Sequence, residues 1–212
     1  LHILGAGGIV RTVDSSSPLY ITAWFMEFLA YCAVNCYALI SGYVGVNSKF
    51  RISSILLLWL QVSSTTLAIT CAFYLFGERS VTLQEVWDSC MPLKNQYYWY
   101  FTAYVCLYFM TPFLNWFILN LGARMVKRLV LTLMLFFCVI PTFFEADLFV
   151  LHNGYSALWL IILYIVGGVI KRYQSHITIK KRILLCGYLG AVSLTLLLKL
   201  VIEYLTPRVS LK

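Results

Sequence analysis

Long apolar runs separated by short polar gaps dominate the pattern of this chain. Several of these runs contain no charged residue at all. Each is close to the ~20 residues that a helix needs to cross a bilayer. The pattern therefore predicts an all-α, polytopic bundle with about six complete spanning helices. They are expected at residues 20–46, 52–76, 97–121, 129–144, 153–170 and 183–198.

Two of the predicted spans need comment. The run 129–144 is short for a membrane crossing, and we expect residues 145–149 to lengthen it. The last run is extended by Lys199 and Glu203, an i,i+4 pair that we place near the outer interface, where snorkelling explains it without function.

Composition supports the membrane interpretation. Hydrophobic residues make up 61% of the chain and charged residues only 11%, whereas soluble domains carry about 25% charged residues. Without repeats, low-complexity tracts or linkers, residues 1–212 are expected to form one domain whose main partner is the lipid bilayer. The chain begins at Leu1 rather than Met, so we expect an internal piece, truncated at both ends, with His2 in the stub of a preceding helix.

The basic residues indicate orientation. Ten of the sixteen Lys and Arg residues fall in gaps on one side of the predicted bundle, and acidic residues gather in the opposite gaps. The positive-inside rule places the basic gaps in the cytoplasm. The net charge of +8 is mostly this topology pattern, and no soluble basic face suggests a nucleic-acid partner. The ten residues are Lys49, Arg51, Arg124, Lys127, Arg128, Lys171, Arg172, Lys180, Lys181 and Arg182.

The stretch from Cys32 to Arg51 carries the most informative polar residues. Its apolar helix holds one amide, Asn35, and closes on Ser41-Gly42-Tyr43 before the basic pair Lys49 and Arg51. An unpaired amide costs free energy in hydrocarbon, so a polar group inside a membrane helix marks a candidate site. Hydrogen bonding between helices is the alternative role for Asn35.

Other polar and aromatic residues leave two interpretations open. The cluster from Tyr97 to Tyr104 is either an aromatic belt at headgroup level or a stacking platform for a sugar or lipid-linked acceptor. Glu27 could orient a base or face water, and His152 is expected to be solvated rather than a second base. Most of the seven cysteines lie inside apolar runs, without His or carboxylate at ligand spacing, which predicts neither a disulfide framework nor a metal site.

Three motifs, in this order along the chain, carry a family resemblance. They are the Cys32–Arg51 stretch, Gln96–Tyr104 leading to Thr111-Pro-Phe-Leu-Asn115, and Gly154–Tyr164. Together they resemble the acyltransferase family 3 membrane proteins, bacterial O-acyltransferases that decorate cell-envelope glycans and related cell-surface molecules. The resemblance extends from His2 to about Arg182. Members of that family have more spanning helices, so this chain would be the middle of one.

The resemblance implies roles for particular residues. His2 matches the family's histidine that is thought to be the catalytic base. Imidazole suits removal of a hydroxyl proton near neutral pH. An arginine that precedes this histidine in the family has no counterpart here. The implied donor-binding residues are Ser41, Tyr43, Lys49 and Arg51, and the implied acceptor-binding residues are Asn35, Trp99, Tyr100 and Tyr155.

The expected function is an integral O-acetyltransferase of the bacterial cell membrane. Acetyl-CoA or another acyl-CoA would be the donor substrate, with no permanently bound cofactor. The acceptor would be teichoic acid, capsule, peptidoglycan, a lipid-linked sugar or a small molecule. A transporter and a non-catalytic membrane anchor or sensor remain alternatives. A transporter usually shows inverted repeats, which this sequence lacks, and neither alternative explains the motifs together.

Overall fold

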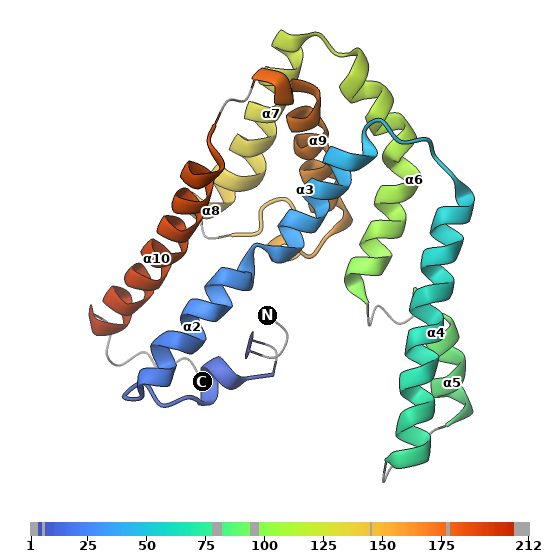
Figure 1. Cartoon of the computed structure of the whole chain (residues 1–212), viewed down its shortest axis with the longest axis vertical. Helices are drawn as coiled ribbons and strands as arrows, with labels where there is room; N and C mark the ends of the chain where they lie inside the picture. Colours follow the sequence, from blue (N-terminus) through green and yellow to red (C-terminus); the bar gives the residue numbers. More distant parts are fainter. Residues whose placement is uncertain are drawn as a thin grey trace. The chain divides into compact units, whose positions relative to one another are not determined.

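A computed structural model of the chain describes residues 4–5, 7–77, 82–93, 98–144, 146–176 and 179–205 (Figure 1). Within these ranges every regular element is a helix, and none is a β-strand. The all-α fold class predicted from the apolar runs is therefore confirmed.

The helices follow one another along the chain with short connections. Their bounds are α1 Ile9–Thr12, α2 Pro18–Tyr31, α3 Ala33–Gly45, α4 Ile52–Phe76, α5 Leu83–Cys90, α6 Trp99–Asn120, α7 Ala123–Met134, the π-helix η2 Leu135–Val139, α8 Ile140–Phe144, the 3₁₀-helix η3 His152–Gly154, α9 Ala157–Tyr173, the 3₁₀-helix η4 Gln174–His176 and α10 Lys181–Leu205.

Among the described residues, five helical segments are long and apolar enough to cross a membrane. The predicted span at residues 153–170 corresponds to α9, whose 17 residues extend about 26 Å, slightly less than a bilayer core of ~30 Å. Since α9 also carries the most buried residues of these helices, it is the central helix of its unit. The five segments are Pro18–Gly45, Ile52–Phe76, Trp99–Asn120, Ala123–Phe144 and Lys181–Leu205.

The fourth span reaches its length differently from the sequence prediction. Its helix begins at Ala123 rather than near Leu129, and it continues without a break through η2 and α8 to Phe144. After Phe144 the described residues form a bend and a turn instead of helix. The expected extension through residues 145–149 is therefore wrong. The extra turns at the start contain Arg124, Lys127 and Arg128, whose long side chains can reach the interface from a helix.

The chain divides into two compact units, Leu1–Tyr37 with Ser175–Lys212, and Ala38–Gln174. In the second unit α9 packs against α6 and α7, and α5 packs along α4 (Figure 1). An apolar core lies between α3, α6 and α9, where Leu107, Ile118 and Leu160 are almost completely enclosed. This core holds the polar side chains of the candidate site in place.

Two glycines set the close approach of α3 and α9 in the second unit. A Cβ atom added at Gly42 would stand 2.0 Å from the carbonyl oxygen of Tyr164, and one added at Gly167 would stand 2.0 Å from that of Leu39. Because van der Waals packing drives helix association in lipid, small residues at such crossings let two backbones touch. The Gly42 of the Ser-Gly-Tyr motif therefore has a packing role.

In the first unit, α2 packs against α10. The predicted Lys199–Glu203 pair is present, and Lys199 also donates a hydrogen bond of 2.6 Å to the hydroxyl of Tyr20. That hydroxyl donates to Glu203 at 2.7 Å, and the Lys199 ammonium lies 4.1 Å from the ring centroid of Trp24. The pair thus joins two helices rather than only reaching the interface.

Candidate functional site

A row of tyrosines runs along one face of α6. Tyr100, Tyr104 and Tyr108 are spaced four residues apart, so their side chains lie one above another on the helix. The ring centroids are 6.2 Å apart between Tyr100 and Tyr104, and 6.4 Å apart between Tyr104 and Tyr108. All three are half-buried. We call Tyr100, Tyr104 and Tyr108 the tyrosine row.

Aromatic side chains from two helices meet at the Tyr100 end of the row. The ring of Trp99 lies edge-on to those of Tyr155 and Tyr100, with centroid distances of 4.7 Å and 5.6 Å. Three of the residues assigned to the acceptor are therefore brought together, although Tyr155 is far from the others in sequence. Tyr155 is exposed, whereas Trp99 and Tyr100 are half-buried.

The other end of the row contacts the segment that precedes α4. The Tyr108 hydroxyl accepts a hydrogen bond from the backbone N–H of Arg51 at 3.3 Å and donates to its carbonyl oxygen at 2.8 Å. Phe50 packs against Tyr108 with a centroid distance of 5.1 Å. The side chains of Lys49 and Arg51 are exposed on either side of this anchor. The row therefore connects the aromatic cluster to the predicted donor-binding pair.

Polar side chains from α3 and α9 join the middle of this arrangement. Ser41 hydrogen-bonds with Tyr104. The hydroxyl of Tyr164 donates to Asn115 at 2.8 Å, and the Asn115 amide donates to the Gly45 carbonyl at 2.9 Å. Asn115 thus links all three helices. Asn115 and Tyr164 lie within the family motifs, but the sequence alone indicates no role for either residue.

Tyr43 lies in a separate cluster at the end of α9. Its hydroxyl donates to the Gln174 side chain, and the Lys171 ammonium lies 4.8 Å from the centroid of its ring. Arg172 donates to the carbonyl oxygens of Ile118 and Leu121, the second at 2.7 Å. Arg172 therefore satisfies the end of α6, where the last carbonyls of a helix lack partners. Lys171 and Arg172 are half-buried, whereas Arg51 is exposed.

The remaining assigned residues belong to the first unit. Asn35 is half-buried near the start of α3, while His2 lies outside the described residues. Glu27 of α2 is only 7% exposed, so it does not face water. A Cβ atom added at Gly5 would stand 2.6 Å from the Oε1 atom of Glu27. The Oε2 atom of Glu27 has no hydrogen-bond partner among the described residues. Glu27 is therefore a buried carboxylate beside the segment that follows His2.

His152 and the cysteines show no sign of a second site. His152 is exposed, as expected, and its backbone N–H donates to Asp147 at 2.6 Å. Cys32 and Cys36 place their sulfur atoms 3.8 Å apart, but Cys36 is exposed rather than packed inside. Within the described ranges, no group of three His, Cys, Asp or Glu side chains could hold a metal ion.

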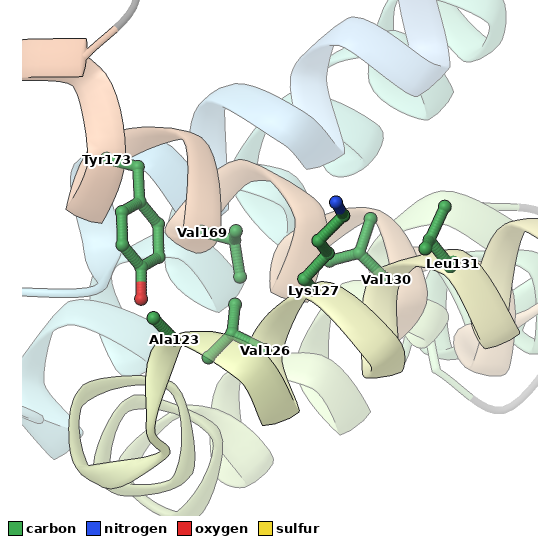
Figure 2. Close-up of a pocket in the computed structure, with 7 residues that line it drawn as sticks. All are labelled: Ala123, Val126, Lys127, Val130, Leu131, Val169 and Tyr173. Carbon is green, nitrogen blue, oxygen red and sulfur yellow. The ribbon is translucent and has the colours of Figure 1, made fainter.

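A groove of about 320 Å³ lies between α7 and α9, and Figure 2 shows the side chains along it. It is lined mainly by aliphatic side chains, with Lys127 and Tyr173 as its polar members. It is separate from the tyrosine row, since the two share no residue.

The fold and the polar side chains within it define a multi-pass helical membrane protein with a polar stripe inside one of its units. The model of the acyltransferase domain family Acyl_transf_3 matches residues 1–208, nearly the whole chain. The chain therefore belongs to this family, as its motifs indicated, and it is a membrane acyltransferase. No curated protein and no solved structure matches it.

Proposed function

We propose that this protein transfers an acetyl group from acetyl-CoA on the cytoplasmic side of a bacterial cell membrane to a hydroxyl group on the outer side. The acceptor is a cell-envelope glycan or a related molecule. The family supplies the acyltransferase activity, and the remaining details are our inference from the site.

The continuous row of hydroxyl and aromatic groups supports the proposal more than any other single observation. The row connects the Trp99 and Tyr155 rings at one end with the backbone of Arg51 at the other, within a unit whose core is apolar. Polar side chains inside a membrane protein are costly, and they usually mark a substrate pathway. A transfer between opposite sides of the membrane requires such a pathway.

The charges suit a donor on the side of Lys49 and Arg51. The positive-inside rule assigns this side to the cytoplasm, where acetyl-CoA is made. Coenzyme A carries phosphate groups, and Lys and Arg bind phosphate as point charge and fork respectively. The side chains of Lys49 and Arg51 are exposed, and Tyr108 fixes the backbone of Arg51 directly before α4. Rings at the other end of the row, those of Trp99 and Tyr155, suit the apolar face of a sugar.

We assign the role of general base to His2. The base takes the proton of the acceptor hydroxyl, the oxygen attacks the thioester carbonyl carbon, and the carbon–sulfur bond breaks. Coenzyme A then leaves as a thiol after accepting the proton. Glu27 is buried next to Gly5, three residues after His2, and a carboxylate there suits orientation of an imidazole.

The test measures acetyl transfer in membranes that contain the protein, with radiolabelled acetyl-CoA as donor. We expect label in an envelope fraction, lost in His2→Ala. His152→Ala is the matched control, because His152 is also a histidine and its side chain is exposed. Protein-dependent transfer that survives His2→Ala would remove His2 from its role. Absence of any protein-dependent label would contradict the proposed donor.

A further inference from the structure

The groove between α7 and α9 has the character of a lipid site rather than a water-filled pocket. Val126, Val130 and Leu131 of α7 form one wall, and Val169 of α9 forms the other (Figure 2). From Ala123 to Leu131 the groove follows nine residues of α7, whose first and last Cα atoms are about 12 Å apart along the axis at a rise of ~1.5 Å per residue. Since α7 begins a membrane-spanning segment, an aliphatic groove along it suits an acyl chain.

Three cations stand along this part of α7. Arg124, Lys127 and Arg128 are all exposed, and within the described ranges they make no hydrogen bond or ion pair. Lys127 itself lines the groove. The basic residues of α9 differ, because Arg172 satisfies carbonyl oxygens of α6 and its neighbour Lys171 contacts Tyr43.

Neither helix that forms the groove carries a carboxylate of its own. Residues 89–144 and 148–202 contain neither Asp nor Glu, so α7 and α9 are both free of acidic side chains. The cations also stand in the first two turns of α7, where the partial positive charge of the helix start opposes them. An anion from outside the chain would relieve this unfavourable arrangement.

We propose that the groove binds an anionic phospholipid of the facing leaflet. One acyl chain lies along Val126, Val130 and Val169, and the phosphate lies beside Lys127. An acyl-CoA donor fits less well, since a two-carbon acetyl group leaves an aliphatic groove of this length empty. A helix of a partner protein is a poor occupant as well, because a helix is ~10 Å across and the groove has a volume of only about 320 Å³.

The preference for a lipid over the donor rests on the proposed acetyl group, and lipid binding tests the proposal without measuring acetyl transfer. The purified protein is placed in nanodiscs of phosphatidylcholine alone, or of phosphatidylcholine with phosphatidylglycerol. Retention of phosphatidylglycerol is then measured by native mass spectrometry. We expect selective retention, weakened about fivefold by Lys127→Ala, since a Lys near an anionic surface contributes ~1 kcal/mol.

Lys181→Ala is the matched control, because Lys181 is also an exposed lysine near the start of a spanning helix. Val130→Trp fills the groove without changing charge and should displace the lipid, while an unchanged thermal unfolding midpoint shows that the variant folds. Equal retention of the two lipids would overturn the proposal. So would equal losses in Lys127→Ala and Lys181→Ala, or displacement of the lipid by soluble coenzyme A.

Discussion

The crossing of α3 and α9 gives the sharpest prediction for stability. In Gly167→Ala the new Cβ atom would stand 2.0 Å from the Leu39 carbonyl oxygen, and ordinary contact begins at 3.4 Å. The two helices must therefore separate by about 1.4 Å, the difference between these distances. Overpacking of this kind costs ~1–3 kcal/mol. The rigid obstacle is backbone, so no side-chain rotation relieves it.

The matched control is Gly187→Ala in α10, where an added Cβ atom meets nothing within 4 Å. Alanine is ~0.8–1.0 kcal/mol more favourable than glycine inside a helix, so this variant should be as stable as the wild type or more stable.

Thermal unfolding of the detergent-solubilised protein measures both variants. A domain of this size changes its Tm by ~2–4 °C per kcal/mol. We expect the Tm of Gly167→Ala to fall by several degrees and that of Gly187→Ala to hold or rise. If both variants unfold at the same temperature, the close crossing of α3 and α9 is wrong.

Three further predictions concern the polar side chains. Tyr108→Phe removes both hydrogen bonds to the Arg51 backbone, so we expect a KM for acetyl-CoA raised severalfold, measured from initial rates, with Tyr98→Phe, outside the row, as control. Asn115→Leu leaves the Tyr164 hydroxyl and the Gly45 carbonyl without partners, which should cost ~1–3 kcal/mol and lower the Tm; an unchanged Tm would contradict the link between the three helices. Glu27→Gln keeps the size of the side chain but loses its charge, so we expect acetyl transfer to fall at least tenfold while the Tm holds, whereas Glu203→Gln should retain activity; equal activities would remove Glu27 from its positioning role.

The spans could be predicted from sequence because hydrophobic length alone determines them. The sequence does not predict the end of a span where charged residues belong to the helix. Arg124, Lys127 and Arg128 look like a loop on a polarity scale, yet they form the first turns of α7. Long basic side chains extend from a helix to the interface, so a basic residue does not mark where such a helix ends.

Contacts between distant segments could not be predicted from a single sequence. Asn115 bonds to Gly45 and Tyr164, which are 70 and 49 residues away. The four-residue spacing of the tyrosine row is visible in the sequence, but its attachment to Arg51 depends on packing. The burial of Glu27 likewise follows from the segment at Gly5, which lies over it only in the folded chain.

Sidedness of acetyl transfer tests the central claim most directly. Inverted and right-side-out membrane vesicles containing the protein are each given labelled acetyl-CoA on the outside only. The proposed pathway predicts acetylation in inverted vesicles, where the Lys49 and Arg51 side faces the donor, and none in right-side-out vesicles. Acetylation confined to right-side-out vesicles would contradict both the orientation and the route along the tyrosine row.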